Sequence, residues 1–419
     1  MSTKNVNRPG YKPTEIGWIP KEWECAKLGD LFEEKNEFTS DIKECPLYSL
    51  TIEGGVVPKT ERYERSFLLK NKEGNQYKKV SLGEIVFNPM NLRFGAIGLS
   101  AVPHDVTVSA YYNIIAPQKN VDARYYIKLL QSRRMINRYD TIAIGSLIEK
   151  RRVHWSILKE QSVPLPSFPE QRRIAEILST WDRAIDQTRR LLEACKRRKQ
   201  GLMQKLLTGT WRFPEFGEPA TNGELPGGWK TIEIGMICII VSGSTPSTAK
   251  DEYWNGTIKW VTPAEISDTD ILISDTERHL TEQGMRAARL RLMPKGTILL
   301  TSRAPIGKIA IANAEMACNQ GFKNLVCMND IFNYFLFYSL KRKKEYIESL
   351  GRGGTFKEIT KDIVSKIKIL LPPFPEQEQI ASILTVADAE ITTLQKSFEK
   401  LQLQKRGLMQ KLLTGEIRV

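Results

Sequence analysis

The nine residues GLMQKLLTG stand at 201–209 of the chain and return unchanged at 407–415, an offset of 206 residues (407 minus 201). Two further pairs of segments keep this offset: PSFPEQRRIAEIL at 166–178 matches PPFPEQEQIASIL at 372–384, and GWIPKEW at 17–23 resembles GELPGGW at 223–229. A single offset over such a length indicates a duplicated domain rather than a short-period array. We therefore predict two copies of one unit, at about 17–209 and 223–415, joined by a linker rich in proline and glycine.

Each copy ends in a predicted long helix. Pro169 and Glu170 suit the first turn of a helix, and Gly209 is placed to end it. Apolar residues recur at helical spacing and at matching positions in the two copies. They are Ile174, Ile177, Leu178, Trp181, Ile185, Leu192, Cys195, Leu202 and Leu206, and then Ile380, Ile383, Leu384, Ala387, Ile391, Phe398, Leu401, Leu408 and Leu412. About 38 residues at about 1.5 Å each would make a rod of roughly 57 Å.

A rod with one narrow apolar stripe must bury that stripe. We predict that the two helices pack against each other as an antiparallel coiled coil. The alternative is that each helix packs on its own globular domain. A basic run, Lys196, Arg197, Arg198 and Lys199, has Gln402, Leu403, Gln404 and Lys405 as its counterparts. We interpret the run as a solvated helix face, with phosphate contact or subunit docking as the alternatives.

The composition favours a nucleic-acid partner. The chain has 419 residues, a net charge of +14, 41% hydrophobic and 26% charged residues. The positive surplus suits a polyanion, although an acidic protein partner or simple solubility would also agree with it. No apolar run approaches the roughly 18 residues of a membrane helix. The N-terminus MSTKNVNRPG lacks the apolar core of a signal peptide, so we expect an intracellular, cytoplasmic protein.

We predict neither a metal site nor covalent chemistry. The six cysteines form no C-x-x-C pair, and the three histidines are scattered. NPMN at 88–91 only partly matches the Asn/Asp-Pro-Pro-Tyr/Phe loop of amino-methyltransferases, and we interpret it as a strand-to-turn segment. The chain also lacks the G-x-x-x-x-G-K-[ST] motif of a P-loop.

Basic residues stand beside glycine and hydroxyl residues in several predicted loops. In the second copy these loops are GSTPSTAK (243–250), SRAPIGK (302–308), NQGFK (319–323) and GRGGTFKEI (351–359). Such residues supply phosphate contacts and can also contact base edges. The candidate DNA-contact residues are Ser244, Thr245, Ser247, Lys250, Arg303, Lys308, Gln320, Lys323, Thr355 and Lys357 there, and Lys59, Arg62, Arg93, Tyr111, Tyr112, Lys150, Arg151 and Arg152 in the first copy.

The chain resembles the DNA-specificity subunits of type I restriction–modification enzymes over nearly its full length. The resemblance rests on the paired PxFPEQ and GLMQKLLTG segments, on GSTPS…YW…IKWVTPAEI at 243–266 and on GGTFKEIT at 353–360. The first copy lacks a clear GSTPS…YW segment, and its IGSLIEKRRV at 144–153 matches GGTFKEI only loosely. The site residues of the second copy are therefore the better supported ones.

The resemblance implies a mixed α/β fold with two target-recognition domains, 1–166 and 210–372, and two conserved spacer helices, 167–209 and 373–419. Each domain would read one half of a bipartite asymmetric DNA site, and the helices would set the spacing. Two methyltransferase subunits carrying S-adenosylmethionine would dock on the chain, and restriction subunits using ATP and Mg would join them. The chain itself would be non-catalytic and bind no cofactor. The alternatives are a non-specific nucleic-acid-binding scaffold, a stand-alone DNA methyltransferase, and a family member whose partners are lost.

Overall fold

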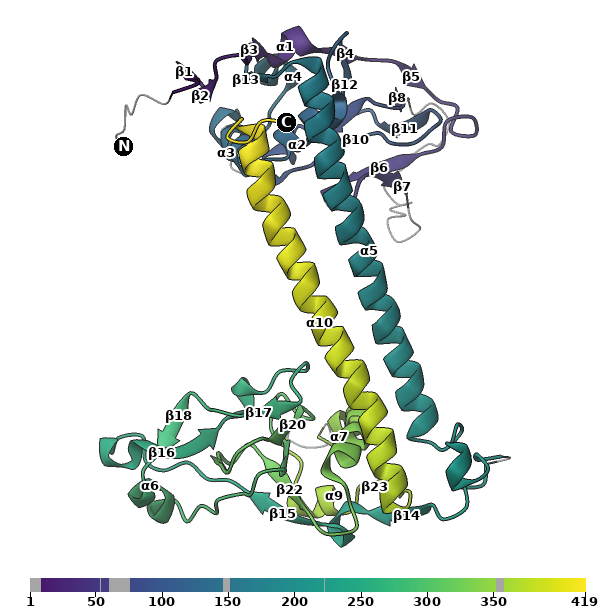
Figure 1. The fold of residues 1–419 in the computed structure, drawn as a ribbon, viewed down its shortest axis with the longest axis vertical. Coiled ribbons are helices and arrows are strands. Elements are labelled where there is room, and N and C mark those ends of the chain that lie inside the picture. The colour runs from purple at the N-terminus through teal and green to yellow at the C-terminus, as the bar shows by residue number, and fades with distance from the viewer. Residues whose placement is uncertain (1–8, 53, 60–75, 146–150, 222, 352–357) are drawn as a thin grey trace. The chain divides into compact units, whose positions relative to one another are not determined.

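The computed structural model describes residues 9–52, 54–59, 76–145, 151–221, 223–351 and 358–419. The chain divides into two compact units (Figure 1). Unit 1 comprises residues 1–188 with 397–419, and unit 2 comprises residues 189–396. Each unit therefore contains the start of one long helix and the end of the other. None of the helices within the described ranges combines the length and the hydropathy that a membrane span requires.

Unit 1 is built on a four-stranded antiparallel sheet in the order β10-β9-β12-β4. Its strands are β4 (Phe32–Lys35), β9 (Ile85–Phe87), β10 (Ile97–Leu99) and β12 (Asn113–Pro117). A second sheet contains β5 (Phe38–Thr39), β8 (Tyr77–Val80) and β11 (Val106–Ser109). Three strand pairs complete the β structure: β1 (Tyr11–Thr14) with β2 (Gly17–Pro20), β3 (Glu24–Lys27) with β13 (Ser162–Leu165), and β6 (Tyr48–Thr51) with β7 (Gly55–Pro58). The short helices are α1 (Leu28–Leu31), α2 (Ala123–Leu130), α3 (Arg133–Ile142), α4 (Trp155–Leu158) and the 3-10 turn η3 (Leu92–Phe94).

Unit 2 repeats this frame and adds an edge strand. Its main sheet has the order β15-β22-β19-β20-β17, with β15 (Cys238–Ser242), β17 (Leu272–Ile273), β19 (Ile298–Leu300), β20 (Ile309–Ala312) and β22 (Lys323–Cys327). A smaller sheet joins β16 (Trp254–Val261), β18 (Arg278–Leu280) and β21 (Ala317–Cys318), and β14 (Lys230–Glu233) pairs with β23 (Lys368–Leu371). The helices are α6 (Glu282–Ala287), α7 (Asn333–Arg342), α8 (Lys344–Leu350) and α9 (Lys361–Ser365), with 3-10 turns η5 (Pro214–Phe216), η6 (Ile234–Met236), η7 (Asp251–Tyr253) and η8 (Pro263–Glu265).

The two long helices, α5 (Phe168–Leu206) and α10 (Phe374–Leu413), run antiparallel where they meet in each unit. In unit 1, Leu178 and Leu412 belong to one core, and Asp182 pairs with Lys405. In unit 2, the start of α10 and the end of α5 share a second core in the same way. Every residue of the predicted apolar stripe is buried or half-buried. The predicted mixed α/β fold with antiparallel paired helices is confirmed, and both helices also pack on globular cores.

One interhelical ion pair occurs in both units at equivalent positions. Asp182 binds Lys405 in unit 1, and Asp388 binds Lys199 in unit 2. Each pair maps onto the other by the 206-residue offset. Lys199 belongs to the basic run predicted as a solvated face, and its side chain is only 12% exposed. It is the one position of that run whose counterpart is also a lysine, because this ion pair requires it in both units.

The start of each long helix is closed by a buried carboxylate. In unit 2, Trp229 Nε1 donates to Glu376 (3.0 Å), and Arg212 donates to both carboxylate oxygens (2.9 Å each). In unit 1, Trp23 and Arg418 bind Glu170 in the same pattern, at 2.9 Å from the indole and 2.6 and 3.0 Å from the guanidinium. We call each of these groups a latch.

The arginine of each latch follows the GLMQKLLTG segment that ends the other copy's helix. Arg418 comes after the second such segment and closes the unit built from the first copy, whereas Arg212 does the reverse. Gly415 lies in the left-handed region (φ 72°), where a Cβ atom would come within 2.3 Å of Pro20. Gly209 is equally close to Pro226, at 2.4 Å. The repeated segments are therefore alike because they fit equivalent receptors.

The glutamine of each FPEQ segment ties the helix to the neighbouring globular layer. Gln171 accepts from the Asp122 amide (2.9 Å) at the start of α2 and donates to the Pro166 carbonyl (3.0 Å). Gln377 does the same at the start of α7, accepting from the Phe332 amide (2.8 Å). The duplicated helix start therefore positions both the helix and the domain that precedes it.

Candidate nucleic-acid interface

Strand register brings the loops of unit 2 that were predicted to contact DNA to one end of its main sheet. Ser242, the last residue of β15, lies opposite Lys323, the first residue of β22. Thr301, after β19, bridges to Phe322, before β22. The loops 243–250, 302–308 and 319–322 therefore leave the sheet at the same end. The described part of the fourth segment joins them, because Ile359 donates its amide to the Ser302 carbonyl (2.9 Å).

Two of these loops contact each other through candidate residues. Thr245 Oγ1 donates to Gln320 Oε1, and both side chains are exposed. The Ser244 amide donates to the Cys318 carbonyl (3.1 Å). At Gly243 an added Cβ atom would lie 2.2 Å from two carbonyl oxygens of the neighbouring loop. Glycine is thus required for the close approach that presents a hydroxyl and an amide side by side, groups that can contact base edges.

Glu358 organises the cationic candidates at this end of the sheet. It accepts from Arg303 Nε (2.9 Å) and from Lys323 Nζ (3.1 Å). Burial raises the pKa of Glu358, but these two hydrogen bonds outweigh it and hold the pKa below the usual value. Arg303 is 49% exposed, whereas the Lys323 side chain is 10% exposed. Arg303 is therefore open to a ligand, and Lys323 supports Glu358 from inside the domain.

Two tryptophans that sequence reasoning left out of the site support the 243–250 loop. Trp254 Nε1 donates to the Ser247 carbonyl, and Trp260 Nε1 donates to the Ser244 carbonyl, both at 3.1 Å. The Arg278 guanidinium lies over the Trp254 ring, 3.5 Å from its centroid, in a cation–π contact. The sequence signal that could have indicated this role is the segment YW…IKW, which contains both tryptophans.

The remaining unit 2 candidates lie on the same loops. Ser247 and Lys250 are exposed, and Lys250 Nζ lies 3.2 Å from the Tyr253 hydroxyl. Lys308 ends the 302–308 loop, and its ammonium donates to the Ile266 carbonyl (2.6 Å). Thr355 and Lys357 lie outside the described residues.

Unit 1 has the equivalent end of its sheet, with different side chains. Phe87, the last residue of β9, lies opposite both Asn113 and Ile97, so the loops 88–96 and 110–112 meet there. Val153 donates its amide to the Pro89 carbonyl (2.9 Å), as Ile359 does to Ser302 in unit 2. NPMN at 88–91 follows β9 directly, and Met90 donates its amide to the Asn88 side chain (3.0 Å). The predicted strand-to-turn role of NPMN is confirmed.

The described candidates of unit 1 gather at this end with one exception. Arg93 and Arg151 each lie 3.5 Å from the Asp140 carboxylate. The Arg152 guanidinium lies 5.7 Å from the Tyr111 ring centroid. Tyr112 is half-buried, and burial raises its pKa. The exception is Lys59, an exposed residue that follows strand β7, while Arg62 and Lys150 lie outside the described residues.

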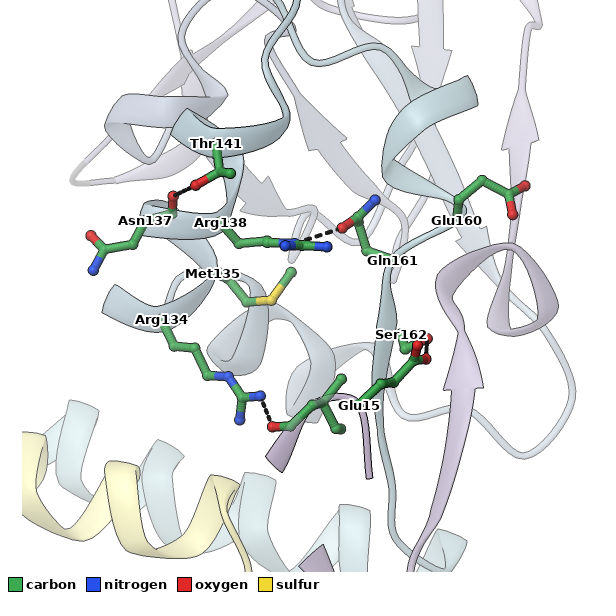
Figure 2. Close-up of a pocket in the computed structure, with 10 residues that line it drawn as sticks. Glu15, Arg134, Met135, Asn137, Arg138, Thr141, Glu160, Gln161 and Ser162 are labelled. Atoms are coloured by element: carbon green, nitrogen blue, oxygen red, sulfur yellow. Dashed lines mark hydrogen bonds between the residues drawn. The ribbon is translucent and has the colours of Figure 1, made fainter. Parts of the chain in front are cut away.

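Unit 1 also has a cavity of about 410 Å³ that contains none of these candidates (Figure 2). Arg134 and Arg138 of α3 point into it from one side, and Glu15, Gln161 and Ser162 line the other. Arg138 Nε donates to Gln161 (2.8 Å), and Arg134 donates to the Ile16 carbonyl. Both arginines are thus already hydrogen-bonded to the cavity wall. In the part of the chain that the structure describes, no group of three or more His, Cys, Asp or Glu side chains is placed to hold a metal ion.

Comparison with known proteins agrees with this organisation. The family model of the type I restriction modification DNA specificity domain matches the chain twice, at residues 20–197 and 226–403. A putative type I restriction enzyme MjaX specificity subunit of Methanocaldococcus jannaschii is 29% identical over 98% of this chain and 97% of its own length. The MjaVIII specificity subunit of the same organism is 24% identical over 96% and 94%.

A solved structure shares the fold. The S subunit of a type I restriction-modification system from M. genitalium has a TM-score of 0.60 at 16% identity, covering 93% of this chain and 96% of that one. The two family matches span most of the chain and respect the 206-residue offset, since 226 follows 20 and 403 follows 197 by that number. The chain therefore belongs to the type I restriction modification DNA specificity family and carries two copies of its domain.

Proposed function

We propose that this chain is the non-catalytic DNA-specificity subunit of a type I restriction–modification complex, and that each unit reads one half of a bipartite, asymmetric DNA site. The observation that carries this proposal is that each unit has its own main sheet, and that the candidate loops leave these two sheets at equivalent ends. Loops of both units converge there on equivalent strands, but the side chains they present differ. Two readers with one frame and different loops suit a target with two different halves.

The side chains suit readout of a DNA duplex. Unit 2 offers a hydroxyl and an amide, Thr245 and Gln320, beside the exposed guanidinium of Arg303. Unit 1 offers arginines and an exposed tyrosine, Tyr111. Hydroxyl, amide and guanidinium groups can all hydrogen-bond to base edges in the major groove, with different preferences. The two units would therefore prefer different half-sites.

The long helices would hold the two readers and receive the catalytic subunits. Half-sites on one face of a duplex recur about every helical turn, roughly 34 Å, so a spacer is needed. The duplicated latches and the duplicated ion pair build two like frames, which suits the docking of two like methyltransferase subunits. In this proposal S-adenosylmethionine, Mg and ATP are used by the partner subunits, next to cytoplasmic DNA.

An exchange of one reader tests the proposal. Residues 17–165 are replaced by the first domain of another family member, and methylated adenines are mapped across the genome of cells carrying the complete complex. We expect the first half of the recognised motif to change while the second half and the spacer length remain. If both halves change together, the modular assignment is wrong. If purified complex binds all duplexes with one salt-dependent affinity, the chain is a non-specific scaffold instead.

A further inference from the structure

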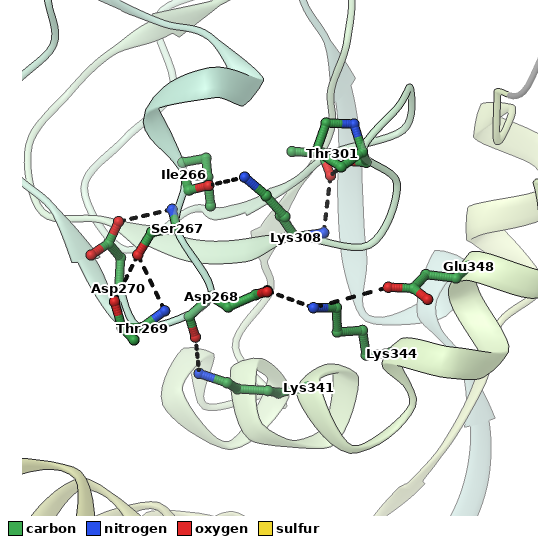
Figure 3. A network of polar contacts seen from close by, with 11 residues as sticks. Ile266, Ser267, Asp268, Thr269, Asp270, Thr301, Lys308, Lys341, Lys344 and Glu348 are labelled. Atoms are coloured by element: carbon green, nitrogen blue, oxygen red, sulfur yellow. Dashed lines mark hydrogen bonds and ion pairs between the residues drawn. The ribbon is translucent and has the colours of Figure 1, made fainter. Parts of the chain in front are cut away.

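Three lysines of unit 2 hold the loop 266–270 (Figure 3). Lys308 Nζ donates to the Ile266 carbonyl (2.6 Å), and Lys341 Nζ donates to the Asp268 carbonyl (3.1 Å). Lys344 Nζ binds the Asp268 carboxylate (2.5 Å). The lysines come from separate places: Lys308 directly precedes β20, Lys341 lies near the end of α7, and Lys344 is the first residue of α8. We call Lys308, Lys341 and Lys344 the lysine corner.

The lysine corner adjoins the loops assigned to DNA. Lys308 is the last residue of the loop 302–308, and helix α8 packs against this loop. A Cβ atom at Gly351 would lie 2.2 Å from Ile306, and one at Gly307 would lie 3.2 Å from Glu348. The corner therefore continues the candidate interface of unit 2 onto α7 and α8.

The ion pair at the surface of the corner is open to exchange. The Asp268 side chain is 64% exposed and that of Lys344 is 34% exposed. Ion pairs in such surroundings stabilise a protein only weakly, because water competes for both charges. Lys344 also lies 3.9 Å from the Glu348 carboxylate, a long contact in a half-exposed setting. An ammonium has three N–H donors, so Lys344 can bind a further anion beside these two carboxylates. A phosphate could thus replace the carboxylate at little cost.

The charge around Lys341 also favours an arriving anion. Burial lowers the pKa of Lys341, and the ammonium groups of Lys199 and Lys344 lower it further, against opposing effects of Asp388 and Asp268. Lys341 and Lys344 both donate to Asp268, so their ammonium groups lie close together. An additional negative group would relieve the repulsion between these ammonium groups.

We propose that Lys341 and Lys344 bind a backbone phosphate of the DNA duplex whose bases the adjoining loops contact, and that Asp268 occupies the place of this phosphate when DNA is absent. The inference rests on the proposed function and adds to it a contact that positions the duplex without reading its sequence. Lys308 keeps the loop 266–270 in place beside the phosphate.

The test uses the full chain with its methyltransferase partners and measures duplex affinity over a range of NaCl concentrations. For Lys344→Gln we expect weaker binding of cognate and non-cognate duplexes alike, and a slope of log K against log salt that is smaller by about 0.9. For Asp268→Asn we expect tighter binding, because the competing carboxylate is gone. Lys344→Arg, which keeps the charge, should keep the slope.

Lys366→Gln is the control, because Lys366, directly after helix α9 of the same unit, pairs with Asp362 at 2.9 Å in an exposed ion pair outside the lysine corner. Its slope should equal that of the unmodified chain. The proposal is overturned if Lys344→Gln leaves affinity and slope unchanged, or if Asp268→Asn weakens binding as a purely structural pair would.

If Lys344→Gln binds DNA normally but no longer assembles with the methyltransferase subunits, the lysine corner contacts a protein partner, and the proposal is also overturned. A complex of the unmodified chain that prefers no sequence would instead overturn the proposed function, so the two failures can be told apart.

Discussion

The two latches provide an internally controlled test of how burial sets the strength of an ion pair. Arg212 and Glu376 in unit 2 are 3% and 1% exposed. Arg418 and Glu170 in unit 1 form the same bidentate pair, but Arg418 is 41% exposed and also pairs with the exposed Glu22. Replacing each arginine by methionine removes the guanidinium while keeping much of the apolar stem. The pair of variants therefore compares one chemical change in two environments.

The expected losses differ because a buried charge without its partner is costly. Arg212→Met leaves the Glu376 carboxylate inside the protein with the indole N–H of Trp229 as its remaining latch donor, and breaking a buried pair costs about 3–5 kcal/mol. Glu170 is 7% exposed, but the arginine that covers it is 41% exposed. Removing that guanidinium in Arg418→Met should open Glu170 to water, so about 1–2 kcal/mol is expected there. A domain of this size changes its Tm by about 2–4 °C per kcal/mol. The shifts should be roughly 6–20 °C for unit 2 and roughly 2–8 °C for unit 1.

Hydrogen exchange measured by mass spectrometry can assign each loss to its unit, since amides in β22 report on unit 2 and those in β12 report on unit 1. Scanning calorimetry then supplies the Tm values. The double variant Arg212→Met/Glu376→Gln should recover part of the loss, because it removes the unpaired charge as well. Equal losses in the two units, or no recovery in the double variant, would refute the reasoning.

Three further outcomes are expected. Gly415→Ala should destabilise unit 1 by about 1–3 kcal/mol in urea titrations, because of its φ of 72° and the contact with Pro20, whereas Gly407→Ala, with nothing near its Cβ position, should stabilise it by about 0.5–1 kcal/mol. Burial raises the pKa of Asp182, but hydrogen bonds from two lysines outweigh it and lower the pKa below its unfolded value. Asp182→Asn should therefore lower the free energy of unfolding by its full amount above about pH 4, and by less as the pH falls through the folded pKa. Urea titrations of the variant and the unmodified chain at pH 7 and pH 3 measure this difference. The fragment 1–221 contains one latch carboxylate, Glu170, and one latch arginine, Arg212. Light scattering should show a dimer in which the arginine of each fragment binds the carboxylate of the other. A monomer would contradict the reasoning that the arginine of one copy closes the helix start of the other copy.

Much of the architecture was readable from the sequence because duplication leaves a signal that needs no structure. One offset linked the helix starts, the helix ends and the tryptophan segments, and the apolar stripe predicted two paired helices. The loops that carry Thr245, Arg303 and Gln320 were predicted from glycine, hydroxyl and basic residues together, and the structure brings them to one end of the sheet. DNA contact by these residues stays a prediction. The roles of Trp254 and Trp260 were not found, because an indole that supports a loop looks the same in sequence as one in a core.

The sequence alone determined that the chain is two copies of one unit, since identity at a constant offset is a property of the chain and not of its packing. Only the tertiary structure decided which unit is closed by the residues that follow each GLMQKLLTG segment. Arg212 and Arg418 occupy equivalent positions after identical segments, and nothing local distinguishes their partners. A helix of 39 residues rises roughly 58 Å from start to end. The tail therefore cannot return to the carboxylate at the start of its own helix, and it closes the unit built from the other copy.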